Sequence, residues 1–161
     1  MTHTSVRRAR AEDALALHGL SRLFFRSGAL RERPPALYAR DSADFLMAES
    51  AGGALAGCLA LRVHPPGQAG AGGSGGVLYN FCVAPGRQGQ GIGSALLRAA
   101  LAEAAARSLR SVFTATSGGG ELFLRHGFAP VEPRFAPSAW VNALDPRRGS
   151  RVLARTVTGG S

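Results

Sequence analysis

The sequence predicts an α/β protein built on a mixed β-sheet. Short apolar runs typical of strands alternate with stretches whose apolar residues recur at helical spacing. An apolar strand at 77–83, a glycine-rich loop and a long helix follow one another in the centre of the chain. The expected element order is β-α-α-β-β-β-α-β-α-β-β, a central sheet flanked by helices. The length of 161 residues, 45% of them hydrophobic, suits a single compact domain spanning 1–161.

Two helices and three strands are expected in the first part of the chain. Leucines within Glu12–Arg26 form a helical stripe, and Gly28 is expected to end that helix. A second helix can open at Pro34-Pro35 and run through Tyr38 and Arg40, because proline is tolerated in a first helical turn. The expected strands are Val6–Arg8, Phe45–Ser50 and Leu55–Val63, with a hairpin turn at Ala51–Gly53.

The second part of the chain opens with the segment Pro65–Gly76, which is dominated by Gly, Pro, Ala and Ser. This composition predicts a connecting loop rather than a functional site. Helices are expected at Ser94–Ser108 and Glu121–His126. The expected strands are Val77–Val83, Ser111–Ala115, one that starts at Phe128, and Arg151–Val157. The proline-containing stretch 129–146, with the single tryptophan, fits no pattern.

The charge balance is strongly basic. Lysine is absent, so all 19 basic residues are arginine, and against 10 acids they give a net charge of +9. Arginine forks bind carboxylates and phosphates, so an anionic ligand or a phosphorylated cofactor would be attracted. A nucleic-acid partner is not expected, because the arginines are not interleaved with aromatic residues and match no recognised motif.

Location and metal content are also constrained. No apolar run reaches the roughly 18–20 residues of a spanning helix, and the first ten residues lack the apolar core of a signal peptide, so a cytoplasmic protein without membrane contact is expected. Cys58 and Cys82 lie in apolar runs without zinc-ligand spacing to the four histidines. Two buried thiols and no metal site are therefore expected.

The strongest functional signal is the loop Gln88-x-x-Gly91-x-Gly93 between the apolar strand and the long helix. The first amides of a helix are unpaired and carry partial positive charge, and glycines let a phosphate approach them closely. A Walker A loop is excluded because the chain has no lysine. A dinucleotide fingerprint is disfavoured, because the spacing is GxGxG and 111–117 contains no acid.

A third phosphate loop does match. Val83-Ala84-Pro85 followed by Gln88–Gly93 resembles the acetyl-CoA loop of the GNAT superfamily of N-acetyltransferases. Phe123-Leu124-Arg125-His126-Gly127-Phe128 resembles a second segment of that family, in which the histidine closes a turn. The resemblance covers about residues 4–158.

The resemblance implies direct acetyl transfer from the co-substrate acetyl-CoA to an amine. It implies that backbone groups of Phe81, Cys82 and Val83, on a central strand that splays from its neighbour, hold the pantetheine and polarise the thioester carbonyl. The pyrophosphate is expected on the amides of Gln88, Gly89, Gln90, Gly91, Ile92, Gly93 and Ser94.

The catalytic acid and base depart from the family pattern. Phe123 stands where many members have a tyrosine acid, and 77–80 of the central strand contain no glutamate base. Tyr79 and Asn80 are the candidates for polar catalytic roles, Tyr38 is a third, and a relay through water is an equal alternative.

The flanks resemble short amino-acid acetyltransferases related to N-acetylglutamate synthase. Four segments carry this likeness: Gly28-Ala29-Leu30-x-x-Arg33, Gly57–Arg62, Phe123–Phe128 and Arg148–Leu153. That group holds two carboxylates with residues at these positions, which implies a substrate-binding set of Arg33, Arg62, Arg148 and Ser150. The expected acceptor is the α-amino group of L-glutamate or a related amino acid.

Two other functions are compatible with the sequence. One is a GNAT enzyme that acetylates a different small amine or a protein N-terminus. Another is a non-enzymatic module that senses acetyl-CoA, which the missing tyrosine and glutamate keep in consideration. The sequence leaves the oligomeric state open, a homodimer included.

Overall fold

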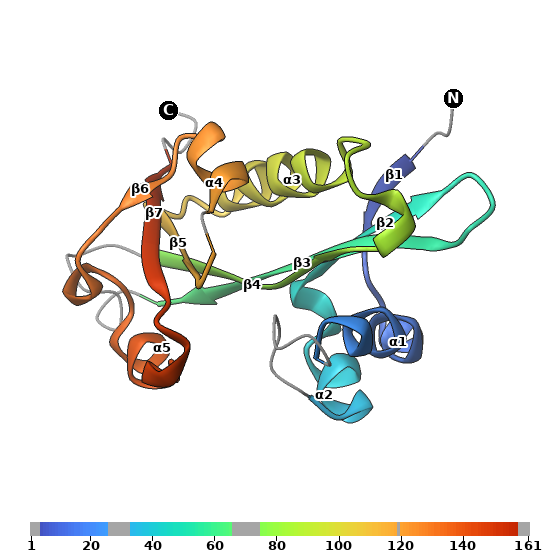
Figure 1. The fold of residues 1–161 in the computed structure, drawn as a ribbon, viewed down its shortest axis with the longest axis horizontal. Coiled ribbons are helices and arrows are strands. Elements are labelled where there is room, and N and C mark those ends of the chain that lie inside the picture. The colour runs from blue at the N-terminus through green and yellow to red at the C-terminus, as the bar shows by residue number, and fades with distance from the viewer. Residues whose placement is uncertain (1–3, 26–32, 66–74, 119, 158–161) are drawn as a thin grey trace. The chain divides into compact units, whose positions relative to one another are not determined.

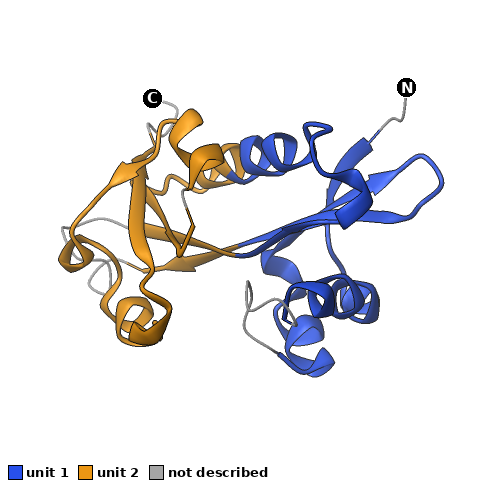
Figure 2. Cartoon of the chain, in the orientation of Figure 1, with its two compact units in different colours: residues 1–60, 80–100 blue, residues 61–79, 101–161 orange. Residues whose placement is uncertain are grey.

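A computed structural model describes residues 4–25, 33–65, 75–118 and 120–157. The strands form one mixed sheet of seven, in the order β1-β2-β3-β4-β5-β7-β6, and the chain alternates strands and helices as expected of an α/β fold (Figure 1). The chain divides into two compact units, shown in blue and orange in Figure 2. Unit 1 contains residues 1–60 and 80–100, and unit 2 contains 61–79 and 101–161.

Unit 1 is built on an antiparallel meander. Strand β1 (Thr4–Arg8) pairs with β2 (Phe45–Ser50), which pairs with the first part of β3 (Leu55–His64). Helices α1 (Ala14–Phe25) and α2 (Pro35–Arg40) lie on one side of these strands, and the start of α3 (Ile92–Ala106) lies on the other (Figure 1). The buried side chains between these layers are mainly aliphatic and aromatic, among them Leu17, Leu20, Tyr38, Phe45, Leu59 and Leu96.

Unit 2 joins parallel and antiparallel pairing. Strand β4 (Gly75–Val83) begins parallel to β5 (Ser111–Thr116), which pairs antiparallel with β7 (Arg151–Thr156), and the two-residue β6 (Ala129–Pro130) pairs with the far edge of β7. The short helix α4 (Glu121–Arg125) lies between β5 and β6 in the chain. Val77, Phe113 and Val152 form a buried cluster covered by Trp140 and Val141.

Those two covering residues belong to α5 (Ser138–Asn142), which lies in the stretch that the sequence left unassigned. The short helical segments of this stretch each start at a proline or directly after one, as at Pro133, Pro137 and Pro146. Proline is compatible with the first turn of a helix, so prolines here begin helices as well as interrupting strands. The expected order of elements is therefore extended by one helix between β6 and β7.

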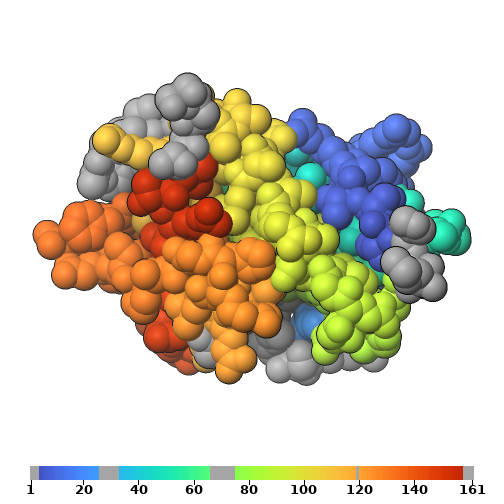
Figure 3. All heavy atoms as spheres, turned by 90° about the horizontal axis from the view of Figure 1, so that it is seen from above, coloured from blue at the N-terminus to red at the C-terminus, as the bar shows by residue number. Residues whose placement is uncertain are grey.

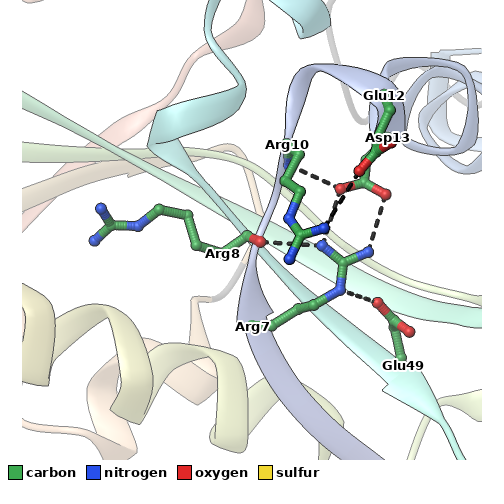
Figure 4. Close-up of polar contacts among 6 residues, drawn as sticks. All are labelled: Arg7, Arg8, Arg10, Glu12, Asp13 and Glu49. Atoms are coloured by element: carbon green, nitrogen blue, oxygen red, sulfur yellow. Dashed lines mark hydrogen bonds and ion pairs between the residues drawn. The ribbon is translucent and has the colours of Figure 1, made fainter.

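A charged network fixes the β1 edge (Figure 4). Arg7 donates through Nη1 and Nη2 to the two carboxylate oxygens of Asp13 at 2.9 Å, and through Nε to Glu49 on β2. Asp13 Oδ2 also accepts from the backbone N–H of Arg10 at 2.8 Å. The network thereby links β1 to its neighbour strand and to the entrance of α1.

Helix α3 packs very closely on β3. A Cβ atom added at Gly57 would lie 2.9 Å from the carbonyl oxygen of Cys82, 3.1 Å from Leu96 Cδ1 and 3.2 Å from Ile92 Cγ2. Only a residue without a side chain allows this approach. Gly57 therefore sets how deeply the first turn of α3 is seated against the sheet.

Several predicted boundaries are shifted. Helix α3 begins at Ile92 rather than Ser94, because Ile92 is 3% exposed and packs as a core residue. Strand β4 begins at Gly75, within the predicted loop, because Gly76 lies so close to Leu61 and Leu109 that a Cβ would be 2.8 and 2.9 Å from their methyl groups. Close packing of strands thus uses glycines that look like a loop in sequence.

Smaller differences concern the ends of other elements. The first strand starts at Thr4 rather than Val6, and α1 starts at Ala14 after a 3-10 turn at Ala11–Asp13. The predicted helix end at Gly28 and most of the predicted 65–76 loop lie outside the described residues.

Candidate functional site

The glycine-rich loop contains two residues whose backbone conformation favours glycine. After β4, a 3-10 turn at Pro85–Arg87 leads into an exposed segment, 88–91, that ends at the start of α3 and contributes to the face of the molecule seen in Figure 3. Gly89 and Gly91 both have a φ of +80°, where other residues are strained. A Cβ at either position would meet nothing within 4 Å, so the glycines are required by conformation, while the space beside them is open.

An arginine next to this loop has an unsatisfied donor. Arg87 donates through Nε to Gln90 Oε1 at 3.0 Å, whereas its Nη2 is buried and has no hydrogen-bond partner among the described residues. A buried guanidinium nitrogen without a partner is costly, and an anionic oxygen is its natural acceptor. Arg87 is not among the residues predicted from the sequence, although a cation directly before Gln88 in a phosphate loop is a usable signal.

Strand β4 leaves its parallel neighbour early. The register with β5 pairs Gly75, Gly76 and Val77 with 111–113, and β4 continues to Val83 beyond these pairs. The next contact with β5 is a long one, from Thr114 Oγ1 to the carbonyl oxygen of Leu78 at 3.5 Å. On the other side of β4, the N–H of Ala84 donates to the Ala56 carbonyl at 2.7 Å, which keeps the end of β4 tied to β3.

Asn80 lies in the core, at the centre of a polar cluster in unit 1. Its side-chain oxygen accepts from the Tyr38 hydroxyl at 3.1 Å, and its Nδ2 donates to Ser21 Oγ at 2.9 Å. Asn80 is 5% exposed and Tyr38 is 1% exposed, so both hydrogen-bonding groups are shielded from water. Burial raises the pKa of Tyr38, which keeps its hydroxyl protonated as the donor.

The two cysteines belong to the same cluster. Cys58 and Cys82 are buried, as predicted, with their sulfur atoms 3.4 Å apart, and the Cys58 thiol donates to the Asn80 carbonyl at 3.5 Å. The hydrogen bond between the thiols, reinforced by burial, raises the pKa of Cys82. The Cys82 thiol is therefore not suited to act as a nucleophile near neutral pH.

Tyr79 and Arg62 contact each other in unit 2. Arg62 Nη2 donates to the Tyr79 hydroxyl at 3.0 Å, and the guanidinium carbon lies 4.8 Å from the centre of the tyrosine ring. Both residues are half-buried. One predicted catalytic residue and one predicted carboxylate-binding residue are therefore neighbours, while the adjacent Asn80 faces into the core.

The other predicted substrate-binding residues come from separate segments. Arg33 is half-buried directly before α2 in unit 1, and its charge counteracts part of the burial effect on the pKa of Tyr38. Arg148 ends a 3-10 turn in unit 2 and is half-buried. Gly149, with a φ of 60°, then directs the chain to Ser150 at the entrance of β7.

The segment at α4 is structural in this chain. Phe123 packs edge-on against Phe128, with 5.4 Å between ring centroids, so it has no polar group to offer. The His126 carbonyl accepts from Arg155 Nη1 at 2.8 Å, and the turn closes through the N–H of Phe128 on the Phe123 carbonyl. The turn-closing role expected for His126 fits these contacts.

The described residues contain neither a cluster of metal-binding side chains nor a helix suited to span a membrane. No group of three or more His, Cys, Asp or Glu side chains in the described part could hold a metal ion. Within the same ranges, no helix has the length and apolar character needed to cross a membrane.

Comparison with known proteins gives one family and several solved relatives. The sequence model of the Acetyltransferase (GNAT) family matches residues 14–128. No curated protein sequence matches the chain. N-acetylglutamate synthase from Neisseria gonorrhoeae, complexed with coenzyme A and N-acetyl-glutamate, is 25% identical with a TM-score of 0.84 over 98% of this chain. The chain spans 36% of the length of that synthase.

Two further solved structures match over nearly their full length. The Mycobacterium tuberculosis protein Rv2747, in complex with coenzyme A, is 25% identical with a TM-score of 0.76, covering 96% of this chain and 99% of that one. The NatC complex bound to Gag peptide and CoA is 12% identical with a TM-score of 0.72, covering 97% and 99%, which shows the shared fold alone. Because the family model covers most of the sequence, the chain belongs to the Acetyltransferase (GNAT) family.

Proposed function

We propose that this chain transfers the acetyl group of acetyl-CoA to the amino group of a small dicarboxylic amino acid, with L-glutamate as the leading candidate. The observation that supports this most directly is the 3.0 Å hydrogen bond from Arg62 to Tyr79, which joins a carboxylate-binding cation to a potential proton donor. A relative with a TM-score of 0.84 was solved with coenzyme A and N-acetyl-glutamate, which is the product expected here.

The loop between β4 and α3 is proposed to bind the pyrophosphate of coenzyme A. The residues are those named from the sequence, Gln88–Ser94, with the backbone of Gly89 and Gly91 opening toward free space. Arg87 is added to this set, because its unpaired Nη2 would gain an acceptor from a phosphate oxygen. Phe81, Cys82 and Val83 would hold the pantetheine and acyl end along the part of β4 beyond its pairs with β5.

Acetyl-CoA supplies an activated acyl group, and the protein must provide for the proton that leaves the amine and the proton that the departing sulfur takes up. Transfer forms a carbon–nitrogen bond, breaks the carbon–sulfur bond, and leaves a proton to pass from the amine to the departing sulfur. Tyr79 is the proposed donor of a proton to that sulfur, with Arg62 holding its hydroxyl in place, and Tyr79 regains a proton through the solvent that takes up the proton of the amine. The base that deprotonates the incoming amine is proposed to be water, because Asn80 is buried and fully engaged.

The acceptor carboxylates are proposed to bind Arg33, Arg62, Arg148 and Ser150. Arginine is suited to this task, because its planar fork can bind a carboxylate through two hydrogen bonds. Arg33, Arg62 and Arg148 are each half-buried, and a cation in that setting attracts an anion more strongly than a fully solvated one.

The test measures release of free thiol from acetyl-CoA across the amino acids and a panel of amines. Release with glutamate, and weaker release with glutamine, is the expected result. Preferential release with a cationic amine or a peptide N-terminus would overturn the acceptor assignment. Binding of acetyl-CoA without turnover of any acceptor would leave a sensing module.

Cofactor binding is tested separately by calorimetry. Gly91→Glu should abolish acetyl-CoA binding, because it places a carboxylate in the loop and strains a backbone with a φ of +80°. Gly86→Glu is the matched control: it adds the same charge where a Cβ meets nothing within 4 Å and no positive φ is required. Tight binding by Gly91→Glu would remove the loop from the proposal.

A further inference from the structure

Strand β4 contains a residue in the left-handed region of backbone space. Asn80 has a φ of +51°, which few residues other than glycine adopt, although asparagine tolerates it better than most. The strand is buried continuously from Gly75 to Leu78, and from Leu78 onward buried and half-buried residues alternate, with Asn80 among the buried ones. The positive φ turns the backbone at Asn80 away from the extended conformation of an ordinary strand residue.

The side chain of Asn80 is held from three other elements of unit 1. Tyr38 of α2 donates to its Oδ1 at 3.1 Å, and Ser21 of α1 accepts from its Nδ2 at 2.9 Å. Cys58 of β3 lies 3.7 Å from Nδ2 through its sulfur, and donates to the Asn80 carbonyl at 3.5 Å. The side-chain amide and the backbone carbonyl of Asn80 are thus bound at the same time.

A left-handed residue inside a strand persists only where its surroundings enforce it. Here the enforcing groups are shielded from water, since Ser21 is 0% and Tyr38 is 1% exposed. Each hydrogen bond would be lost if the backbone at 80 returned to an extended conformation, because the amide would move away from α1 and α2. The network is therefore a conformational lock on β4.

We propose that Asn80 is a positioning residue for acetyl transfer: its buried amide fixes the backbone of β4 so that the groups of Phe81–Val83 face the thioester. The proposal rests on the proposed function, in which Phe81–Val83 hold the acyl end of acetyl-CoA. Asn80 itself contacts neither the substrate nor the cofactor. It acts through the direction of the residues that follow it.

Two substitutions distinguish the ability of residue 80 to adopt a positive φ from the side-chain hydrogen bonds that hold it there. Asn80→Gly permits a positive φ without enforcing it, whereas Asn80→Ala neither permits it easily nor enforces it. Both remove the same side-chain hydrogen bonds. The expected order of kcat is therefore wild type, then Asn80→Gly, then Asn80→Ala, with a loss approaching about 100-fold in the last, the scale of an ångström-sized misplacement.

A positioning role requires that binding stays intact. The dissociation constant of CoA, which lacks the acetyl group, should change less than about 3-fold in either variant, because the pyrophosphate loop is untouched. A purely structural role would instead lower the folded fraction and leave the kcat of the folded enzyme unchanged. Equal kcat values for the Gly and Ala variants, or a rise in KM at constant kcat, would overturn the proposal.

A milder variant protects the test against misfolding. Tyr38→Phe removes one hydroxyl from the lock and retains the ring, so it should fold and show a smaller fall in kcat. Hydrogen exchange at the amides of Phe81–Val83 should become at least about 10-fold faster than in the wild type, because the lock is weakened. Unchanged exchange there would also overturn the proposal.

The hydrogen-exchange measurement does not depend on catalysis. If the wild-type protein released no thiol with any amine, the proposed function would fail, and with it the catalytic purpose assigned to Asn80. Exchange at Phe81–Val83 in Tyr38→Phe would then still decide whether the buried amide locks the strand. If the wild type turns over and Asn80→Ala matches it, the positioning proposal alone fails.

Discussion

The hydroxyl of Tyr38 donates a 3.1 Å hydrogen bond to the side-chain oxygen of Asn80, and it joins α2 to the strand that leads into the glycine-rich loop. Tyr38 is 1% exposed, and burial raises the pKa of its hydroxyl, so the proton needed for this bond stays in place. A helix 42 residues away in sequence thus supports the conformation of the central strand.

Removing this hydroxyl should destabilise the protein. Tyr38→Phe leaves the buried Oδ1 of Asn80 without its donor, which is expected to lower the free energy of unfolding by about 1–3 kcal/mol. Urea denaturation monitored by circular dichroism measures the change. Leu15→Ala, at a side chain 75% exposed on α1, is the control and should shift stability by no more than about 0.5 kcal/mol. A Tyr38→Phe protein as stable as the wild type would show that water or a rearranged side chain satisfies Asn80.

The fold could be predicted from the sequence because its signals are local. Helical stripes, strand-like runs and the prolines before α2 act within a few residues, and the left-handed glycines at 89 and 91 are specified by the motif itself. Gly76 looks like part of a loop in the sequence, because its reason for being glycine is close packing against Leu61 and Leu109, which are distant in sequence.

The polar cluster could not be predicted for the same physical reason. Ser21, Tyr38 and Cys58 are 59, 42 and 22 residues from Asn80, and no periodicity connects them. Sequence reasoning could nominate Asn80 as a polar residue on the central strand, but only the fold shows that its amide is buried and bonded. Arg87 is a partial exception, because its position directly before the loop is visible in the sequence, whereas the burial of its unsatisfied Nη2 is visible only in the fold.

Close packing at Gly57 gives a second prediction. Gly57→Ala places a methyl group 2.9 Å from the Cys82 carbonyl oxygen, and a backbone atom cannot move aside as a flexible side chain can. The expected cost is about 1–3 kcal/mol of unfolding free energy, with weaker acetyl-CoA binding because the first turn of α3 is displaced. Thermal denaturation and calorimetry measure the two effects.

Gly52→Ala is the matched control for this prediction. It makes the same chemical change in the turn between β2 and β3, where an added Cβ meets nothing within 4 Å. Its stability and acetyl-CoA affinity should equal those of the wild type. A tolerated Gly57→Ala with unaltered cofactor affinity would mean that α3 can shift without consequence for the loop.

The network at the β1 edge gives a pH-dependent prediction. The hydrogen bonds from Arg7 lower the pKa of Asp13, so the unfolded chain takes up the proton more readily than the folded one (Figure 4). The stabilising contribution is therefore complete above the unfolded pKa of about 3.9 and is lost as pH falls through the lower folded pKa. Because the Arg7 side chain is 39% exposed, solvent screening limits the contribution to about 1 kcal/mol.

Asp13→Asn should therefore be less stable than the wild type at neutral pH, and the difference should shrink as the solution becomes more acidic than about pH 4. Urea unfolding at a series of pH values measures it. Glu12→Gln is the control, because the Glu12 side chain is 71% exposed and makes only a 3.4 Å contact with Arg10. A difference that persists undiminished at about pH 2 would assign the effect to something other than the Asp13 charge.

Proton transfer is tested at Tyr79. If its hydroxyl protonates the departing sulfur, Tyr79→Phe should lower kcat by about 10²–10⁴-fold, with little change in the affinity for CoA. Steady-state kinetics with saturating acetyl-CoA and calorimetry with CoA separate the two. The substitution retains the ring over which the Arg62 guanidinium lies at 4.8 Å, so the packing of Arg62 is preserved. An unchanged kcat would assign the proton to water or to another group.

The acceptor is tested at Arg62 and Arg148. Removing either side chain leaves a substrate carboxylate without its cation, at a cost of about 2–5 kcal/mol when the pair is fully buried. Both arginines are half-buried, so we expect a cost at the lower end of this free-energy range. A loss of about 2 kcal/mol corresponds to a rise of roughly 30-fold in KM for glutamate. The affinity for acetyl-CoA should be unchanged, because the loss concerns binding of the amino acid.

Arg147→Ala supplies the matched control for Arg148→Ala, because the neighbouring Arg147 side chain is 90% exposed and paired only loosely with Asp145 at 3.3 Å. It should leave KM for glutamate unaltered. Glutamine, which has one carboxylate fewer, should be a much poorer acceptor for the wild type, and the preference for glutamate over glutamine should narrow in Arg62→Ala or Arg148→Ala. If both variants retain wild-type amino-acid kinetics, or if glutamate releases no thiol while a neutral or cationic amine does, the dicarboxylate assignment is wrong. The arginines would then belong to the solvated surface of an acetyltransferase for another amine.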